Sequence, residues 1–394
     1  MAKVLKSILR KVLPAPVKEA LSLGIDTLRE YPQFLLGSGE AKAPRRVDLE
    51  LTFACNARCQ MCPLYGQHVG AGASRPVKPS RADELTTAEL ESILEQCGQL
   101  GVQHVTFTGG EPLVRNDLAH LVAHARSHGM RTGVISNGGL LTQPRAESLM
   151  AAGLNELHIS LDGPQDIHDM VRRVPGLFAK VDANVLALRA MQQASGATEP
   201  LVTVGCTVSA LNQECLAAMV PIASRWQAPL YFAPVFYCTP GQDDATHAMF
   251  PGEEAKPEDW KLPADLLRVD ARLIANGLKA AHAAGRRLGV TVCSQMSGYR
   301  DIHKWFADPA YAHNNKCFYP WYATRVNPYG QVYPCSILTV MGDLRQQSLA
   351  SIWNGDKYKE FRRRLRKAGL FPKCAKCCVL NRQDIVRRFL PRGW

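Results

Sequence analysis

The feature that most constrains the fold is a regular alternation of strand-like and helix-like segments through the middle of the chain. The strand-like runs are rich in Val, Ile, Thr and aromatic residues, and polar or Gly residues follow each of them. They lie at 46–53, 102–109, 130–136, 154–162, 200–209 and 228–237, and helical patterns lie between them at 86–101, 116–129 and 181–196. Thr86 or Thr87 is the expected N-cap of the first helix, and Gly101 its stop. Six such units predict an α/β fold with a parallel sheet, a partial (β/α)6 barrel that resembles a TIM barrel.

Three cysteines, Cys55, Cys59 and Cys62, lie within eight residues directly after the first predicted strand. A structural zinc site would need four ligands, normally as two close pairs. A disulfide framework would need an even number of cysteines in a small secreted chain. Because chemistry in such folds takes place at the carboxyl ends of the strands, this loop is expected at the mouth of the barrel.

Composition excludes several classes of protein. The 394 residues are 46% hydrophobic and 21% charged, which is ordinary for a globular protein. No apolar stretch reaches the length of a transmembrane helix, and the N-terminus lacks the cleavage site of a secretory signal. Thirteen cysteines without export indicate a reducing compartment, where thiolates bind metal instead of pairing. We therefore expect a cytoplasmic protein.

The positive charge is concentrated at the two ends of the chain. The net charge is +12 overall, with +5 in residues 1–46 and +11 in residues 357–394. Nucleic-acid binding is one interpretation of such ends. We favour a solvated helix face that also stabilises an electron-rich cluster or an anionic substrate, and we expect no nucleic-acid partner.

The motifs at the strand ends resemble those of the radical S-adenosylmethionine (radical SAM) enzymes. The cysteine triplet CxxxCxxC follows the first strand, and TGGEP at 108–112 follows the second. SNG at 136–138 and SLDG at 160–163 also stand where that family contacts its cofactor. The resemblance covers roughly residues 46–240 and recurs near the C-terminus.

The resemblance implies a [4Fe–4S] cluster bound by Cys55, Cys59 and Cys62. Three thiolates leave one iron without a protein ligand, and an open position is what substrate-activating metal sites need. In the family, S-adenosylmethionine fills that position. One electron then cleaves it to a 5′-deoxyadenosyl radical, which abstracts hydrogen from an unactivated C–H bond. A flavodoxin- or ferredoxin-type protein is the expected electron donor.

The same resemblance assigns the residues that contact the cofactor. Gly109 and Gly110 would let the backbone approach its methionine end, and the Glu111 carboxylate would receive its ammonium group. The remaining candidates are Ser136, Asn137, Ser160 and Asp162 for the ribose and carboxylate, and Met61 against the adenine. Ordinary turn chemistry at strand ends is the alternative explanation of the SNG and SLDG motifs.

A second group of cysteines lies near the C-terminus. Cys317 and Cys335 bracket a predicted hairpin with an Asn-Pro-Tyr-Gly turn, and a helix over 348–362 then leads to Cys374 and Cys377. This order resembles the SPASM/twitch extension of radical SAM enzymes. We expect these four thiolates to bind one auxiliary [4Fe–4S] cluster, with Cys378 spare or replacing its neighbour. A structural zinc site with the same ligands is the alternative.

The chain thus divides into a basic helical segment (1–45), the barrel (46–300) and the extension (310–394). One face of residues 3–13 is apolar and would suit contact with an anionic membrane, although packing on its own domain is favoured. The acidic segment 241–260 is expected to be a lid at the mouth, with a passive loop as the alternative. Cys238 is the best-placed thiol to donate hydrogen to a substrate radical, with a plain core role as the favoured alternative.

These expectations define a radical SAM enzyme that oxidises, crosslinks or epimerises its substrate. Residues 1–45 are too few for a fused leader-binding domain, which favours a small, sugar-like or anionic metabolite. A ribosomally made peptide is the alternative substrate. A zinc-stabilised nucleic-acid-binding protein is the alternative from another class.

Overall fold

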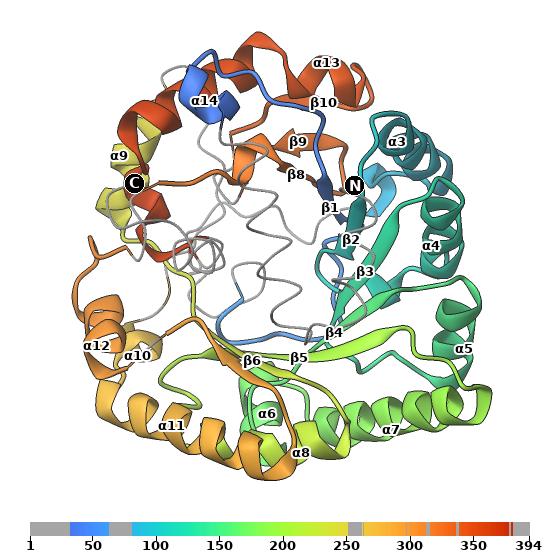
Figure 1. The fold of residues 1–394 in the computed structure, drawn as a ribbon, viewed down its shortest axis with the longest axis vertical. Helices are drawn as coiled ribbons and strands as arrows, with labels where there is room; N and C mark the ends of the chain where they lie inside the picture. Colours follow the sequence, from blue (N-terminus) through green and yellow to red (C-terminus); the bar gives the residue numbers. More distant parts are fainter. Residues whose placement is uncertain are drawn as a thin grey trace, which may run out of the picture.

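The strands of the computed structural model form one continuous sheet. The structure describes residues 32–62, 81–250, 262, 264–296, 298–312, 316–335, 339–377 and 380. Its ten strands lie in the order β10-β9-β8-β1-β2-β3-β4-β5-β6-β7 (Figure 1). Within these residues, every helix is too short or too polar to cross a membrane.

The six predicted strands are confirmed, and they lie side by side in sequence order, all parallel. They are β1 (Arg46–Glu50), β2 (His104–Thr108), β3 (Arg131–Ser136), β4 (Glu156–Ser160), β5 (Leu201–Val208) and β6 (Leu230–Pro234). β7 (Val292–Ser294) adds a seventh parallel strand beside β6. It is only three residues long, too short for the alternation of apolar and polar residues that marked the others.

Helices cover the outer face of the curved sheet (Figure 1). They are α3 (Thr87–Gln99), α4 (Leu118–Ser127), α5 (Gln143–Ala151), α6 (Gln165–Arg172), α7 (Leu177–Ser195), α8 (Met219–Arg225) and α11 (Ala271–Leu288). Thr86 caps α3, and its side chain accepts a hydrogen bond from the N–H of Glu89, whose carboxylate in turn accepts one from the N–H of Thr86. Short 3-10 helices lie at Arg81–Asp83, Pro112–Val114, Leu216–Ala218, Tyr319–Trp321 and Pro372–Lys376.

The C-terminal extension continues the barrel sheet. β8 (Ala323–Val326) pairs in parallel with β1, and β9 (Gln331–Tyr333) and β10 (Gly342–Asp343) follow in antiparallel order. The predicted hairpin is therefore present, with its turn at 327–330. β1 consequently has a barrel strand on one side and a strand of the extension on the other.

The single helix expected over 348–362 is wrong, because two helices, α13 (Leu349–Trp353) and α14 (Asp356–Ala368), share this segment. Asn354 interrupts it, since its side chain hydrogen-bonds both the N–H of Ala41 (3.0 Å) and the carbonyl of Ala41 (2.8 Å). Gly355 follows, where a Cβ would lie 2.8 Å from the carbonyl oxygen of Ser351. The break thus ties the extension to the segment that leads into β1.

Most basic residues of α14 are exposed or partly exposed, as predicted for a solvated helix face, and Arg362 is the exception within this helix. Arg362 is fully buried between Trp353 and Tyr358, with its guanidinium carbon 4.2 and 4.1 Å from the two ring centroids. It also donates to the carbonyls of Pro320 (2.8 Å) and Gly39 (3.1 Å). This arginine therefore holds together three parts of the chain that are far apart in sequence.

The segment after β6 packs on the extension. α9 (Pro240–His247) comes first and lies close to the C-terminal part of the chain (Figure 1), and α10 (Ala264–Leu267) and α12 (Tyr299–Ala307) come before and after α11. Phe250 stacks on Phe361 with ring centroids 5.6 Å apart and meets Phe371 edge to face at 5.1 Å. The rest of the predicted acidic lid (251–260) and the predicted membrane-facing helix (3–13) lie outside the described residues.

Candidate functional site

The cysteine loop after β1 is anchored to the end of α6. The N–H of Arg58 donates to the carbonyl of Arg172 (3.2 Å), and that of Gln60 to the carbonyl of Val171 (2.9 Å). A further bond from the N–H of Cys62 to the carbonyl of Cys59 (3.1 Å) closes a turn within the loop. All three cysteines of the loop are partly exposed. The loop thus presents its thiols at the carboxyl end of β1, as the sequence predicted.

The thiols and the nearby carboxylate in this loop favour the binding of a positively charged group. The pKa of the Cys55 thiol is raised to about 12, mainly by burial and to a smaller extent by the nearby Glu111, Cys59 and Cys62, against a hydrogen bond from the N–H of Ala57. Such thiols are protonated on their own, whereas a metal-bound thiol is deprotonated outright. The three neighbouring sulfurs therefore fit an iron–sulfur cluster.

Gly109 and Gly110 bring the loop after β2 against the cysteine loop. A Cβ would lie 2.4 Å from the carbonyl oxygen of Thr52 at Gly109, and 2.4 Å from that of Ala54 at Gly110. Gly109 also has a φ of +131°, which side chains rarely adopt. The N–H of Gly110 donates to Thr52 (2.7 Å), and that of Glu111 to Ala54 (2.9 Å). These glycines are thus required by the chain's own backbone, a reason that the motif alone did not reveal.

Glu111 is buried, and its carboxylate is bound by the chain itself. Its Oε1 accepts from the hydroxyl of Ser136 (2.7 Å) and the N–H of Leu113 (3.1 Å), and its Oε2 from the N–H of Asn137 (2.8 Å). Burial raises the pKa of this carboxyl, and the three hydrogen bonds oppose that effect. Glu111 therefore joins the loop after β2 to the loop after β3, and the predicted contact with the cofactor ammonium stays a prediction.

Asn137 connects this network to the cysteine loop. Its Nδ2 donates to the side-chain oxygen of Asn56 (2.7 Å) and lies 4.0 Å from the sulfur of Cys55. Its Oδ1 accepts from the N–H of Gly139 (2.9 Å). Asn56 lies inside the CxxxCxxC motif but was not identified from the sequence, because its role depends on this contact across the barrel mouth.

Arg172, at the end of α6, is the main site residue that the sequence analysis missed. Its guanidinium forms an ion pair with Asp162 (2.7 Å), and another nitrogen lies 3.6 Å from the sulfur of Cys59. Its Nε is buried, and no described residue accepts a hydrogen bond from it. A buried donor beside a cysteine sulfur suits an anionic ligand, such as the carboxylate of an amino acid.

His168 lies one helical turn before Arg172 and is fully buried. Its Nδ1 accepts a hydrogen bond from the N–H of Asp162 (3.3 Å). Burial, and secondly the charge of Arg172, lower the pKa of His168 to about 3, so the ring is neutral. The i, i+4 spacing of a histidine and an arginine after SLDG was the available signal for both residues.

The structure also shows where the other predicted residues lie. Ser160 ends β4, partly exposed, and Met61 lies in the cysteine loop beside Cys62. Cys238 is buried in the turn between β6 and α9. Their contacts with the cofactor, and the role of Cys238 as a hydrogen donor, stay predictions.

The second group of cysteines also comes together. Cys317 precedes β8, Cys335 follows β9, and Cys374 and Cys377 lie at the 3-10 helix Pro372–Lys376. Burial raises the pKa of the Cys374 thiol well above its usual value, and the neighbouring Cys335 and Cys317 raise it further. The N–H of Cys377 donates to the carbonyl of Cys374 (3.0 Å). As at the first site, clustered and desolvated sulfurs fit a metal cluster.

Two buried lysines flank these cysteines, and neither was identified from the sequence. Lys373 forms an ion pair with Asp243 on α9 (2.6 Å). Lys376 donates to the carbonyls of Asp308 (2.6 Å) and Tyr311 (2.9 Å), and its ammonium lies 5.1 Å from the ring centroid of Trp305. The cysteine turn is thereby fastened to α9 and to the end of α12.

Comparison with known proteins assigns the family. The model of the radical SAM superfamily matches residues 49–207, and that of SPASM, an iron–sulfur cluster-binding domain, matches residues 317–378. The PqqA peptide cyclase of Xanthomonas euvesicatoria pv. vesicatoria is 30% identical over 339 residues, which are 82% of this chain and 77% of that protein. The chain belongs to the radical SAM superfamily.

Two further proteins similar to this radical SAM chain agree with the assignment. The AdoMet-dependent heme synthase of Methanosarcina barkeri is 28% identical over 327 residues, which are 81% of this chain and 85% of that protein. SuiB of Streptococcus suis, solved bound to S-adenosylmethionine, has the same fold, with a TM-score of 0.59 and 14% identity. That match covers 90% of this chain and 77% of SuiB. The predicted family, fold class, [4Fe–4S] cluster, S-adenosylmethionine and auxiliary iron–sulfur binding are confirmed.

Proposed function

We propose that this radical SAM enzyme modifies a peptide, joining two of its side-chain atoms in an oxidation that removes two hydrogens. The observation that carries the proposal is the 30% identity to a PqqA peptide cyclase across both the radical SAM and the SPASM regions. From the sequence alone, a sugar-like metabolite is the first expectation and a peptide the alternative. The relatives support the peptide better.

Two groups of cysteines would bind the two clusters. Cys55, Cys59 and Cys62 would hold the first cluster, with Arg172 and Asn137 beside their sulfurs. Cys317, Cys335, Cys374 and Cys377 would hold the auxiliary cluster. When bound, the first cluster and S-adenosylmethionine would supply a radical that takes one hydrogen atom, and the auxiliary cluster would accept the second electron while the second hydrogen leaves as a proton to solvent.

Arg172 would orient the cofactor through its carboxylate. Its ion pair with the fully buried Asp162 fixes the guanidinium, and the buried Nε supplies a donor that the described residues leave unused. Because the same guanidinium lies beside Cys59, it would also stabilise that thiolate.

The test is anaerobic reconstitution followed by two measurements on the same sample. 5′-Deoxyadenosine release with dithionite reports radical formation, and mass spectrometry reports the loss of two hydrogens from peptides encoded next to this gene. We expect both, and Cys55→Ala should abolish both. Release of 5′-deoxyadenosine without change in any such peptide would contradict the peptide proposal while leaving radical chemistry intact.

The relative from M. barkeri favours a second candidate, a tetrapyrrole substrate, because its name is that of a heme synthase and the match covers 85% of it. The same reconstituted enzyme should then convert an added porphyrin, with the change in mass followed by mass spectrometry. Conversion of the porphyrin and not of the peptides would replace the first candidate by the second.

A further inference from the structure

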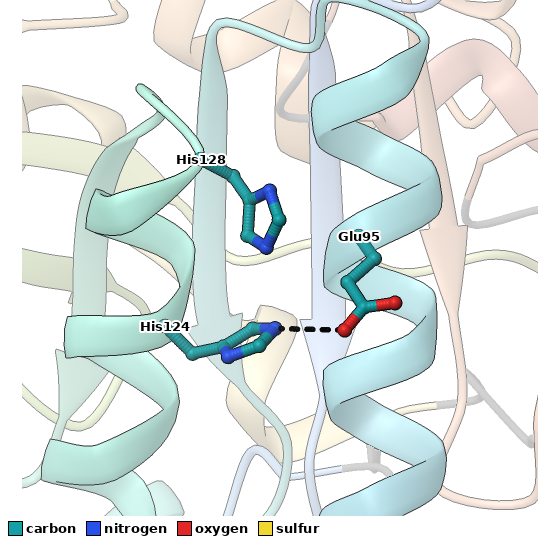
Figure 2. A group of neighbouring side chains, drawn as sticks. All are labelled: Glu95, His124 and His128. Carbon is teal, nitrogen blue, oxygen red and sulfur yellow. Dashed lines mark ion pairs between the residues drawn. The ribbon is translucent and has the colours of Figure 1, made fainter.

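A cluster of histidine and glutamate side chains lies on the outer face of the barrel, on α3 and α4. Glu95 on α3 faces His124 on α4 and His128 at the end of α4 (Figure 2). One ligand atom from each of these three residues lies within 4.8 Å of the other two. No part of the radical SAM site described above uses these residues.

His124 lies between two carboxylates, one near each nitrogen of its ring. Its Nε2 points towards Glu95, 3.7 Å from Oε1, and this nitrogen is buried without a hydrogen-bond partner among the described residues. Its Nδ1 lies on the other side, 4.0 Å from a carboxylate oxygen of Glu91. That carboxylate is itself fixed by His120, whose Nε2 is 2.5 Å away. A hydrogen bond from one ring N–H to a carboxylate commonly orients the other nitrogen towards a metal ion, and Glu91 would have to move closer to accept it.

His128 reaches the cluster because α3 has a glycine opposite to it. A Cβ on Gly98 would lie 2.9 Å from the Cβ of His128 and 3.2 Å from its Nδ1. Glycine inside a helix is less stable than alanine, so Gly98 lowers the stability of α3. Its missing side chain leaves space for the His128 ring, whose centroid lies 4.9 Å from that of the His124 ring.

We propose that Glu95, His124 and His128 bind one divalent transition-metal ion, with Zn²⁺ as the best match. Two imidazoles and one carboxylate, with a water in the fourth position, are an established ligand set for zinc. At metal–ligand distances of about 2.0 to 2.2 Å, tetrahedral ligand atoms lie roughly 3.4 Å apart, so the three groups must move slightly closer. The Glu95 side chain is half exposed and can make that movement.

Such an ion would link α3 and α4, the helices that precede and follow β2 in the chain. The loop after β2 carries Gly109 to Glu111. This link would also stabilise the C-terminal extension, because α3 contacts the extension directly. Glu89 of α3 forms an ion pair with Arg345 (2.7 Å), and Gln96 accepts a hydrogen bond from the N–H of Leu349 (2.8 Å). The site is independent of the substrate proposed above.

The test uses the full-length reconstituted holoenzyme, dialysed against micromolar Zn²⁺, with zinc and iron per chain measured by mass spectrometry. We expect about one zinc per chain in excess of any at the cysteines, with the iron content unchanged. His124→Ala and His128→Ala should lose that zinc, and Glu95→Gln, nearly the same in shape, should bind it at least tenfold more weakly. His282→Ala, a partly buried histidine on α11, is the matched control and should retain it.

Two results would overturn the proposal. One is a wild-type protein that binds no more zinc than His124→Ala does. The other is a Glu95→Gln protein that binds zinc as tightly as wild type, and this comparison decides the matter if a histidine variant fails to fold. Zinc should also raise the melting temperature of the wild type and the His282→Ala control but not that of His124→Ala.

Discussion

Glu111→Gln replaces one oxygen by an amide nitrogen, and the structure makes this change costly. Oε1 accepts from Ser136 and Leu113, and Oε2 accepts from Asn137. A glutamine has only one oxygen to offer. If its NH2 group takes the Oε2 position, it faces the N–H of Asn137. If it takes the Oε1 position, it faces the N–H of Leu113, although the Ser136 hydroxyl can turn to accept.

The loss of stability in Glu111→Gln can be estimated from one buried N–H group that is left without an acceptor. Such a group costs about 1 to 3 kcal/mol, and weakening the remaining charge-assisted bonds adds to it. We therefore expect a loss of about 2 kcal/mol in the stability of the loops after β2 and β3. Because Asn137 contacts Asn56 (2.7 Å), the disturbance reaches the cysteine loop. If the whole loss of about 2 kcal/mol appears in cofactor binding, the affinity for S-adenosylmethionine drops about 30-fold.

The assay is S-adenosylmethionine binding to the reconstituted protein by equilibrium dialysis, together with thermal unfolding before the cofactor is added. The network predicts that Glu111→Gln lowers both the affinity and the melting temperature. Ser136→Ala is the graded control, because it removes one donor and leaves two N–H groups on the carboxylate, so its effects should be smaller. A normal melting temperature with weakened binding would refute this reasoning and support a direct contact between Glu111 and the cofactor ammonium.

Three other predictions follow from single contacts. Gly110→Ala places a methyl group 2.4 Å from a backbone oxygen, and overpacking typically costs about 1 to 3 kcal/mol, so iron content and melting temperature should fall. Gly241→Ala, with no atom within 4 Å, should change neither. The pKa of His168 is lowered to about 3 in the folded chain. Between about pH 6.5 and pH 3, this histidine is therefore protonated in the unfolded chain only. The free energy of unfolding should fall by up to about 1.4 kcal/mol for each pH unit between about pH 6.5 and pH 3. Urea unfolding of His168→Gln should show a shallower dependence; an equal slope would contradict the assignment. Cys335→Ala should lose about four irons per chain and form little product, yet still release 5′-deoxyadenosine with dithionite.

The strands and the two cysteine groups were predictable because each leaves a local pattern. β1 to β6 are apolar runs with polar ends, and CxxxCxxC with TGGEP identifies the mouth of the barrel. β7 escaped prediction because three residues carry no periodicity. The break between α13 and α14 escaped because it depends on Asn354 bonding Ala41, a residue more than three hundred positions away.

The residues around the sulfurs were less predictable for the same reason. Nothing near Arg172 in sequence says that it will lie 3.6 Å from Cys59, and nothing near Lys376 says that it will be enclosed by Trp305 and Tyr311. Single polar residues of this kind acquire their roles only when distant segments meet. The motif residues differ because several of them occur together at a fixed spacing.

The shared sheet bears on whether the extension transfers electrons or only braces the barrel. If it were only a brace held by metal, Cys335→Ala would unfold the barrel mouth and abolish cofactor cleavage. β8, however, is bound to β1 by a parallel ladder from Arg46↔Ala323 to Leu49↔Val326, and the Tyr319 hydroxyl donates to Asp48 on β1 (2.9 Å).

Neither of these contacts requires metal, and the same is true of the buried Arg362 that joins α14 to the carbonyls of Pro320 and Gly39. The strand that leads into Cys55 should therefore keep its place when the auxiliary cluster is lost. Cleavage that continues while product formation stops would then report the missing electron acceptor and not a collapsed site. Loss of cleavage together with a lower melting temperature would show that the sheet and Arg362 are insufficient, and that the extension acts as a brace.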